Sequence, residues 1–521
     1  MADGEDSKWT ALDKNDYTND ALHFYKSENV ETVNGVLKIT TNLKDNDYKA
    51  FNEKTKKFYM DTKHVQSAMI QGWNKFCITG GIVEFSAKLP GKGSIGGLWP
   101  ALWLLGNLSR ATFVGSSDWV WPFSYDVCDP EKMQQQEINA CRRVSHYGLP
   151  KGVGRGAPEI DILEAMGGEK GALPNTPIQR PYFSSSLQIA PGVSKNRPVL
   201  MHQPSEGHWY EGLEYGGDGN TTALNPFFYG VTLVHKPREF TYQSDAISAN
   251  TQIDQSYFNS QNIYRVEWEP PTPGQNDGYI RWYVNGDFVF GIKGESLNIT
   301  GTSIPSEPMY MIINTAVASS WGFPVPCPDG CSCECYECNN PDCACALPVG
   351  YCDNFPSYFE IDYVRVWQAV NETKHQLGCS TKDRPTETFI LAHEERYKEK
   401  YQKRPLKDIV RGGAPCSSSL DCGGESHGIC NDKGVCECID TFCGSRCLSH
   451  YGFNDEDYGG HEPPLEGKLG TCTVSFIPVL ELNFFSTSNV LSVIDPSTIV
   501  IYYLIWHVIC IPHDSRCFYC E

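Results

Sequence analysis

Hydrophobic and polar residues alternate with a period of two along several stretches of the first 370 residues. In GGIVEFSAKLP (80–90), Val83, Phe85 and Ala87 fall on one side of an extended chain and the polar residues between them on the other. IYRVEWEP (263–270) repeats the pattern with Tyr264, Val266 and Trp268 on one face. A period of two is the period of a β-strand that is buried on one face. These stretches therefore predict strands.

Two further stretches extend the prediction to a large sheet protein. YIRWYVNGDFVF (279–290) predicts a hairpin, because its Asn285-Gly286 pair suits a type I′ turn. YFEIDYVRVWQ (358–368) predicts a final long strand. Helical periodicity is almost missing from this region of the sequence. Residues 1–370 are therefore predicted to form an all-β domain, a β-sandwich.

The length and charge of the chain narrow its class. The chain has 521 residues, of which 40% are hydrophobic, so it can bury a large core, and its length suggests two or more domains. The formal net charge of −20 argues against a nucleic-acid partner, because such proteins need a basic face. Negative charge alone does not identify a partner.

Cysteine usage indicates an oxidising compartment. The sequence holds 23 cysteines, most of them after residue 326. Cysteine-dense segments together with glycosylation sequons are typical of the secretory pathway and the cell surface. The N-terminal MADGEDSKWTALDKNDY lacks the apolar segment of a signal peptide, so either the protein is cytosolic or its true N-terminus is missing; we favour a truncated chain. The sequons begin at Asn107, Asn220, Asn298 and Asn371.

The cysteines fall into two clusters. Residues 327–352 hold eight cysteines and predict a disulfide-bonded insertion, although Cys335-x-x-Cys338 also has zinc-like spacing. Residues 416–447 hold seven and resemble an epidermal-growth-factor-like (EGF-like) module, which needs disulfides because it is too small for a sufficient core. Cys77, at a strand edge, is interpreted as a small buried residue.

The segments around the second cluster are less regular. Residues 371–415 form a charged connector in which HEERYKEKYQKR (393–404) is a possible exposed helix. The tail, 448–521, contains STIVIYYLIWHVICI, whose ~15 apolar residues fall short of the ~20 that a membrane span needs. It fits a short anchor, a packed strand or misread genomic sequence.

Candidate chemistry lies in APEIDILEAMGG (157–168). Glu159 and Asp161 are two apart, but Glu164 follows after three, so a regular strand would put it on the opposite face. A β-bulge at Ile162-Leu163 would return Glu164 to the face of the other two. The two glutamates would then lie roughly 13 Å apart along the backbone, with carboxyl groups near the ~5–5.5 Å of retaining glycosidases. An exposed strand edge with scattered charge and a calcium site are the alternatives.

Aromatic residues favour the glycosidase hypothesis. Trp99 and Trp103 are four apart and share a face of an extended chain, and SSDWVWPFSYD adds Trp119, Trp121 and Tyr125. Sugar rings stack on aromatic planes, so these five residues are candidate substrate platforms, whereas a buried core position is the alternative for each. The sequence shows no Ser-His-Asp or Cys-His arrangement and no phosphate-binding loop, and no cofactor or metal is predicted.

At this point the sequence resembles a known family. EIDILE is similar to the Glu-x-Asp-x-x-Glu active-site strand of glycoside hydrolase family 16. The stretches QGWNKFCITGGIVE, WPFSYDVCD, GRGAPEIDILEA and EPMYMIIN resemble, more narrowly, the fungal-type β-glucan-synthesis-associated (β-1,6-glucan) proteins. The similarity covers most of residues 8–368 but not the cysteine insertion or the tail.

The resemblance implies a concanavalin-like jelly-roll sandwich. Glu159 matches the nucleophile, Asp161 the assisting acid and Glu164 the general acid/base. Matching cysteines in similar proteins indicate a disulfide between Cys128 and Cys141. The family also has a further strand and a membrane anchor ahead of the SKWTAL region, which is the reason to expect a truncated chain that lacks its first strand.

Two functions follow from these expectations. The first is a retaining β-glucan hydrolase or transglycosylase in cell-wall glucan assembly, with β-glucan as its partner and possible membrane attachment. The second is a glucan-binding assembly factor that keeps the cleft but has little turnover. Only the first needs Glu159 and Glu164 as carboxylates.

Overall fold

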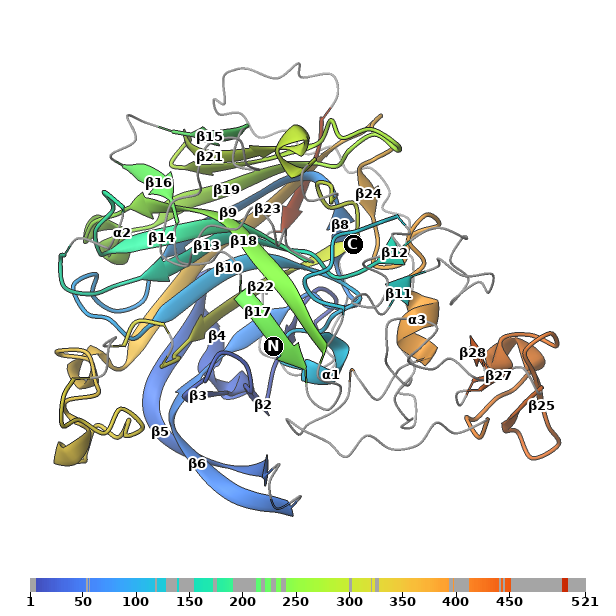
Figure 1. Ribbon diagram of the computed structural model, residues 1–521, viewed down its shortest axis with the longest axis horizontal. Coiled ribbons are helices and arrows are strands. Elements are labelled where there is room, and N and C mark those ends of the chain that lie inside the picture. The colour runs from blue at the N-terminus through green and yellow to red at the C-terminus, as the bar shows by residue number, and fades with distance from the viewer. Residues whose placement is uncertain are drawn as a thin grey trace, which may run out of the picture.

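Two large sheets stacked face to face make up the body of the protein (Figure 1). Its structure is a computed structural model that describes residues 6–52, 55, 57–117, 120–127, 138–139, 154–171, 176–190, 212–216, 221–225, 231–235, 240–298, 302–319, 321–323, 328–392, 397, 412–439, 442–443, 446–450 and 499–504.

The first sheet, sheet I, carries the candidate acidic strand. Its neighbours pair in antiparallel fashion, and its strands in spatial order are β1 (Thr10–Ala11), β7 (Met69–Gln71), β22 (Met309–Ala316), β10 (Trp99–Gly106), β13 (Glu159–Met166), β14 (Tyr182–Ile189), β18 (Phe240–Gln252) and β16 (Thr222–Leu224). Three more strands attach to it: β17 (Val231–His235) pairs with β18, β8 (Cys77–Thr79) with β22, and β24 (Gln376–Leu377) with β8.

The second sheet, sheet II, packs behind the first. Its strands in spatial order are β15 (Leu213–Tyr215), β21 (Asp287–Lys293), β20 (Tyr279–Val284), β19 (Asn262–Glu269), β9 (Gly81–Lys88), β23 (Ser357–Ala369), β5 (Val36–Asn52), β6 (Lys57–Ser67), β3 (His23–Tyr25) and β2 (Lys14–Asn15), with β4 (Val30–Val33) on β5 and β29 (Ile499–Leu504) on β23. β5 and β6 run on beyond the sandwich as a curved two-stranded ribbon, drawn in blue at the bottom of Figure 1.

The remaining described elements are short. The helices are α1 (Val114–Ser117), α2 (Ser256–Asn259) and α3 (Glu387–Ala392), with single 3₁₀ turns at η1 (Ser27–Asn29), η3 (Gly294–Leu297), η4 (Pro341–Cys343), η5 (Cys352–Asn354) and η6 (Ser419–Cys422). The small hairpins are β11 (Ile138–Asn139) with β12 (Gly154–Arg155), β25 (Gly428–Cys430) with β26 (Cys436–Cys438), and β27 (Phe442–Cys443) with β28 (Ser449–His450). The predicted jelly-roll sandwich is confirmed.

The core lies between the two sheets, where the period-two residues meet. The alternate residues of β9 and β19 that were assigned to one face are buried there, including Phe85 and Trp268. The predicted hairpin is β20–β21, and its turn residues Asn285 and Gly286 have φ values of 51° and 91°, as a type I′ turn requires. The predicted final strand is β23. Hydrophobic periodicity therefore located these strands correctly.

Disulfides hold the small peripheral parts together. In the insertion Cys331 pairs with Cys345, Cys335 with Cys343, and Cys338 with Cys352. The EGF-like module is closed by Cys416–Cys430, Cys422–Cys436 and Cys438–Cys447. Disulfides, rather than the zinc alternative, therefore account for the Cys335-x-x-Cys338 spacing.

The interpretation of Cys77 is right about its burial but misses a disulfide bond. Cys77 is buried, but it is also bonded to Cys379, 302 residues further along the chain. The bond and the β8–β24 pairing fasten the start of the charged connector to sheet I. α3 ends one residue before the possible helix at 393–404, of which the structure describes only Tyr397.

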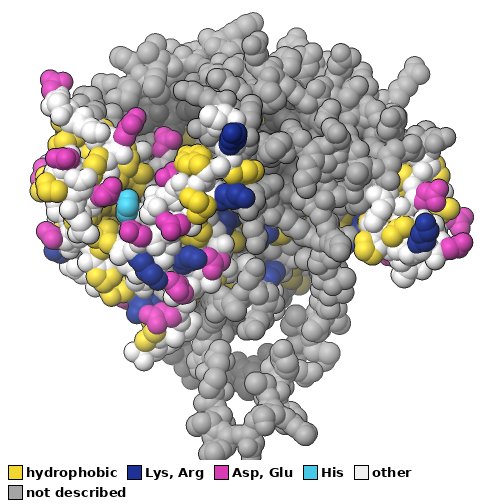
Figure 2. Space-filling model, turned by 90° about the horizontal axis from the view of Figure 1, so that it is seen from below, with side chains coloured by type: hydrophobic (Ala, Val, Ile, Leu, Met, Phe, Trp, Pro, Cys, Tyr) yellow, Lys and Arg dark blue, Asp and Glu magenta, His cyan; other side chains and the backbone are white. Residues whose placement is uncertain are grey.

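The apolar tail run and the surface charge bear on two other predictions, the short anchor or packed strand in the tail and the lack of a basic face for nucleic acid. Residues 499–504 of the apolar tail run form β29 against β23, and the rest of that run lies outside the described residues. Within the described part of the chain, no helix combines the length and the apolar character that crossing a membrane requires. On the face seen in Figure 2, the described lysine and arginine side chains are interspersed with acidic and hydrophobic ones.

Candidate active site

A bulge in β13 brings the three carboxylates to one face. Against β14, Asp161 pairs with Ser186 and Glu164 with Ser184, so three steps on β13 match two on its neighbour. Against β10 the register slips at the same place. Glu159, Asp161 and Glu164 consequently line a single pocket, while Ile160, Ile162 and Leu163 point into the core. The predicted bulge is confirmed.

At the bulge, side chains from both sheets donate hydrogen bonds to backbone carbonyls of β13. The indole N–H of Trp282, a buried residue of sheet II, donates to the Asp161 carbonyl at 2.9 Å. The Ser185 hydroxyl donates to the Ile162 carbonyl at 3.2 Å. Buried carbonyls without partners would destabilise the strand, so these two bonds stabilise its irregular conformation.

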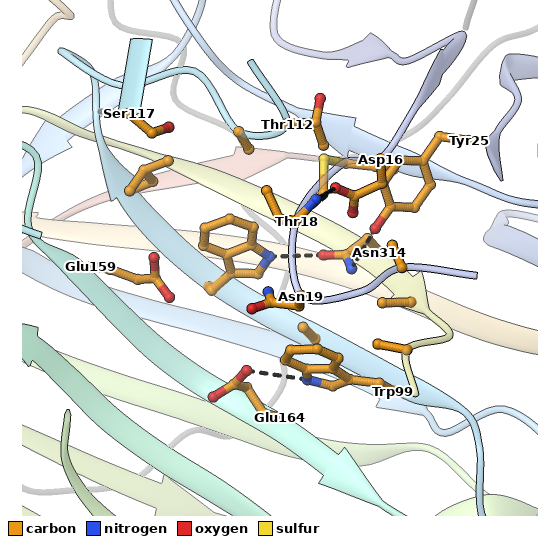
Figure 3. A pocket seen from close by; sticks show the side chains of 18 of the residues that line it. Asp16, Thr18, Asn19, Tyr25, Trp99, Thr112, Ser117, Glu159, Glu164 and Asn314 are labelled. Atoms are coloured by element: carbon orange, nitrogen blue, oxygen red, sulfur yellow. Dashed lines mark hydrogen bonds between the residues drawn. The ribbon is translucent and has the colours of Figure 1, made fainter. Parts of the chain in front are cut away.

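Each carboxylate has its own neutral donor. The indole N–H of Trp121 donates to Glu159 at 2.6 Å, and that of Trp99 donates to Glu164 at 3.1 Å. The second of these bonds is drawn in Figure 3, where Glu159 and Glu164 point into the same space. Glu159 is also hydrogen-bonded to Asp161.

Asp161 is held from the neighbouring strand β14. It accepts from the hydroxyl of Ser186 and, at 3.2 Å, from the amide of Gln188. Its side chain is buried, with 1% of its surface exposed, whereas Glu159 and Glu164 are half-buried. The central carboxylate is therefore fixed and the outer two remain accessible from the pocket.

The electrostatics of this group favour retained protons. Burial raises the pKa of Glu159 well above its usual value, and the charges of Asp161 and Glu164 raise it further. Burial and the charge of Asp161 do the same to the pKa of Glu164. Burial also raises the pKa of Asp161, opposed by its bonds to Ser186, Gln188 and Glu159. Neighbouring carboxyl groups with perturbed acidities are typical of sites of acid–base catalysis.

Tryptophans make up the walls of this pocket. Trp99 and Trp103 both lie on the pocket face of β10, because Leu102 and Leu104 take the core face. Trp99 stacks on Trp321 with ring centroids 4.7 Å apart, and Trp121 lies beside Glu159. The shared face predicted for Trp99 and Trp103 is confirmed.

The N-terminal segment forms another wall, which sequence reasoning missed. Asp16, Thr18, Asn19 and Tyr25 line the same pocket (Figure 3). The segment is held there by parallel pairing of β3 with β6 and by His23, whose Nδ1 lies 2.9 Å from the backbone N–H of Val317. Contacts this distant in sequence leave no periodic signal.

A polar chain joins that segment to a pocket tryptophan. Asp16 lies 3.3 Å from His23, and both side chains are buried. The Asn314 amide donates to the Tyr25 hydroxyl at 3.2 Å and its carbonyl accepts from the Trp103 indole at 2.8 Å. The orientation of Trp103 therefore depends on the N-terminal segment.

The other predicted site residues have different surroundings. Tyr125 is buried with 3% exposure and is not among the residues that line the pocket, so the structure does not support a substrate platform there. Asn107 is also buried, and its amide donates to Asn74, an arrangement that leaves no room for a glycan. Trp119, Cys128, Cys141 and Asn220 lie outside the described residues. Asn298 accepts a hydrogen bond from Asn276, and Asn371 lies on the turn after β23.

A metal is not needed to explain the described cysteines. The one group of side chains with metal-like proximity in the described part of the chain is Cys416, Cys422 and Cys436, and each of these forms a disulfide.

The fold and site together define a protein of the glycoside hydrolase family 16 type: a jelly-roll sandwich with a bulged strand that presents three carboxylates to an aromatic-lined pocket. The chain belongs to the family described as "Beta-glucan synthesis-associated protein SKN1/KRE6/Sbg1", which matches residues 1–325. The family expected from the sequence is confirmed.

Individual relatives agree with this assignment. The β-glucan synthesis-associated protein KRE6 of Candida albicans is 31% identical over 419 residues, covering 76% of this chain and 47% of the relative. The corresponding protein SKN1 of Saccharomyces cerevisiae is 30% identical over 445 residues, covering 80% and 48%. The chain thus spans about half the length of the curated relatives it matches.

Solved structures include a similar sandwich. The laminarinase catalytic domain from Thermotoga maritima aligns with 70% of this chain and 93% of its own, at 19% identity and a TM-score of 0.36.

Proposed function

We propose that the chain is a retaining β-glucan hydrolase or transglycosylase that acts in cell-wall β-glucan assembly, including β-1,6-glucan. The observation that carries the proposal is the bulge, which places Glu159, Asp161 and Glu164 together in a pocket walled by tryptophans. A regular strand would have put Glu164 on the core face.

The proposed reaction has two displacements. Glu159 attacks the anomeric carbon while Glu164 gives its proton to the leaving glycosidic oxygen, and a glycosyl-enzyme ester forms. Glu164, now ionised, then takes a proton from an incoming hydroxyl that attacks the same carbon and releases Glu159. Water as the acceptor gives hydrolysis, and a sugar hydroxyl gives transfer.

Asp161 has the role of holding a proton. Glu159 and Asp161 are hydrogen-bonded, so a proton can move between them. Attack requires an ionised Glu159, so the proton that burial and the charge of Asp161 keep on Glu159 in the free protein has to pass to Asp161 when the substrate binds, which is the distribution that catalysis needs. The Trp121 N–H, 2.6 Å from Glu159, favours this distribution because it stabilises the charged form of the nucleophile.

The tryptophans provide the sugar-binding surfaces in this proposal. Trp99, Trp103 and Trp121 present apolar faces and hold their N–H groups on Glu164, Asn314 and Glu159 respectively. Fixed rings bind at a low entropic cost, because they are already ordered in the free protein.

A narrow pocket favours a second candidate, a glucan-binding assembly factor with little turnover. The pocket has a volume of about 200 Å³, and residues of the N-terminal segment form one of its walls. Ligand pockets commonly measure about 300–1,000 Å³. A pocket this small fits a bound sugar unit better than rapid exchange of long chains.

The compartment belongs to the same proposal. The described disulfides in the insertion and in the EGF-like module favour an oxidising environment, so we place the protein in the secretory pathway or at the cell surface. Membrane attachment remains a prediction of the family resemblance.

The test uses the secreted full chain with its disulfides formed. Wild type, Glu159→Gln and Glu164→Gln are incubated with β-1,3- and β-1,6-linked oligoglucans, and the products are read by mass spectrometry. Glu214→Gln is a matched control, because Glu214 lies on β15 of sheet II and pairs with Lys293. Shortened or lengthened chains from wild type and the control alone support the enzyme.

Azide separates the two carboxylate roles. With Glu159→Ala, azide is expected to take the place of the nucleophile and give an α-glycosyl azide from a β-glucan substrate. With Glu164→Ala it is expected to take the place of the acceptor and give the β-azide. Unchanged glucan bound equally by wild type and both glutamine variants would instead favour the assembly factor.

A further inference from the structure

A row of tyrosines leads out of the pocket along the β5–β6 ribbon. Tyr17 directly precedes Thr18 and Asn19, which line the pocket. Its ring lies edge-on to that of Tyr48 on β5 with centroids 6.3 Å apart, and its hydroxyl donates to the Lys49 carbonyl at 3.4 Å. These contacts join the ribbon to the N-terminal segment that forms this wall of the pocket.

Tyr59 extends the row by one more ring. In the ribbon, Tyr48 pairs with Asp61 and Ala50 with Tyr59, and directly paired residues share a face of the sheet. Tyr48 and Tyr59 are therefore diagonal neighbours on one face, about 7 Å apart. Tyr59 is 47% exposed, while Tyr17 and Tyr48 are half-buried.

Polar groups accompany these rings. The Tyr48 hydroxyl donates to Asp61 at 3.0 Å, and the Lys63 ammonium lies 5.5 Å from the centre of the Tyr48 ring. Burial, the bond to Asp61 and the nearby hydroxyls of Tyr59 and Tyr17 raise the pKa of Tyr48, so its hydroxyl stays protonated.

The opposite face of the ribbon has different chemistry. Phe58 and Met60 are exposed there, at 37% and 64%, and the Lys49 ammonium lies over the Phe58 ring. That face offers apolar rings and methylenes, whereas the tyrosine face combines aromatic rings with hydrogen-bonding groups. A sugar chain, with apolar C–H faces and hydroxyl edges, matches the tyrosine face.

We propose that Tyr17, Tyr48 and Tyr59 form an auxiliary binding track for a β-glucan chain that leaves the pocket past Thr18 and Asn19. The inference deepens the proposed function and rests on it for the identity of the polymer. The row is continuous with the pocket, and this identifies the ligand of the track as the glucan chain itself. A chain held at Glu159 and Glu164 has to leave along one of the pocket walls. The track would favour long chains over short ones.

The experiment compares long and short ligands in a protein without turnover. Laminarin and a β-1,6-glucan serve as the polymers, and the matching trisaccharides as the short ligands, with affinities measured by calorimetry on the full chain carrying Glu159→Gln. Tyr59→Ala is added to that background and is expected to lower the ratio of polymer affinity to trisaccharide affinity about 5–10-fold, the loss of one stacked ring. Phe58→Ala, one residue away on the opposite face, is the matched control and is expected to keep the ratio.

The outcomes separate this inference from the proposed function. An equal ratio for Tyr59→Ala and Phe58→Ala would overturn the track, whether or not the wild type cleaves glucan. A ratio that falls only in Tyr59→Ala supports the track even if the wild type shows no turnover. A change in self-association on sedimentation, with glucan affinity unchanged, would make a second copy of the chain the occupant and would also overturn the proposal. Thermal melting of each variant, with Tyr59→Phe as the conservative replacement that should keep the ratio, excludes misfolding as the cause.

Discussion

Acidic side chains on sheets I and II have different kinds of hydrogen-bond partner. On sheet II, Glu84 accepts from Arg265 at 2.6 Å and from Tyr363 at 2.9 Å. Glu269, on the same sheet, binds Lys374 at 2.6 Å and His375 at 3.0 Å. On sheet I the pocket carboxylates Glu159 and Glu164 accept from tryptophan N–H groups instead.

The two arrangements shift acidity in opposite directions. Burial opposes ionisation of Glu269, but His375 and Lys374 outweigh it and lower its pKa. No cation among the residues that the structure describes pairs with Glu159 or Glu164, and burial raises the pKa of both well above the usual range. Carboxyl groups with such raised pKa values keep their protons because burying the charge is unfavourable, and they are suited to acid–base chemistry. Carboxylates that are paired with cations stabilise the fold instead.

The largest expected effect is on glucan turnover, which should depend on the carboxylates of sheet I and not on that of sheet II. Glu159→Gln and Glu164→Gln are each expected to lower glucan turnover at least about 10³-fold, because an amide neither attacks nor transfers a proton. Glu269→Gln should remain within about twofold of wild type. Initial rates on the oligoglucan that wild type turns over fastest provide the measurement. Equal losses in all three variants would remove the distinction between the sheets.

Asp16 tests whether a histidine partner can lower the pKa of a carboxyl group that is buried in the pocket wall. Burial opposes its ionisation, yet the hydrogen bond and charge of His23 and the Thr18 N–H lower the pKa of Asp16 to about 2. A depressed carboxyl pKa stabilises the fold above the unfolded value of 3.8, and this contribution disappears as the pH falls towards 2. Asp16→Asn is expected to lose about 2 kcal/mol at neutral pH.

The measurement for Asp16 is urea unfolding between pH 2 and pH 7. The difference between Asp16→Asn and wild type should shrink as the pH falls through the window from about 4 to about 2. Asp13→Asn is the control, because Asp13 is an exposed partner of Lys26 and is expected to change stability by less than about 1 kcal/mol. A pH-independent loss in Asp16→Asn would contradict the lowered pKa of Asp16.

Trp121 tests the neutral donors of the pocket. Trp121→Phe removes the N–H that stabilises ionised Glu159, so the pKa of Glu159 should rise further. We expect kcat/KM to fall about tenfold, the size of one hydrogen bond to a charged group, and the acidic limb of its pH profile to move to higher pH. Trp103→Phe is the control for lost ring area, since its N–H binds Asn314 and should leave the limb in place.

The smallest expected effect is on stability at neutral pH, and it has opposite signs for variants on the two sheets. A raised carboxyl pKa means that stability is lost as the pH rises through the folded pKa, so Glu164→Gln should be more stable than wild type at neutral pH by about 1 kcal/mol. Glu269→Gln should be less stable there by a similar amount, because its pairing is present above the unfolded pKa. Thermal melting at pH 4 and pH 7 measures both. Destabilisation by Glu164→Gln at pH 7 would contradict the pKa shift.

The sequence predicts the local geometry well. The interval between Asp161 and Glu164 is enough to predict the bulge, because a period of two leaves no other way to place both on one face. Alternation likewise puts Trp99 and Trp103 together, and Asn285-Gly286 predicts the hairpin turn. Each of these depends on neighbours within a few residues.

Contacts between distant segments were not predictable in the same way. Nothing in the sequence around Asp16 or Tyr25 indicates that this segment lines the pocket beside Asn314. The Cys77–Cys379 bond spans 302 residues, so spacing carries no signal for it. A weak signal did exist for the groups that hold Asp161: the polar residues Ser184, Ser186 and Gln188 alternate along YFSSSLQI and so share one face of a strand. Tyr125 illustrates the reverse error, since an aromatic residue in a polar segment proved to be buried.

The most direct test of the central claim is to trap the glycosyl-enzyme and map the modified peptide by mass spectrometry. A 2-deoxy-2-fluoro β-glucosyl fluoride, extended by a β-linked glucose, forms the ester quickly and releases it slowly. The account predicts one added glycosyl group on the peptide that contains Glu159, lost in Glu159→Gln and retained in Glu269→Gln. A label on another residue, or turnover of glucan with no label at Glu159, would contradict it.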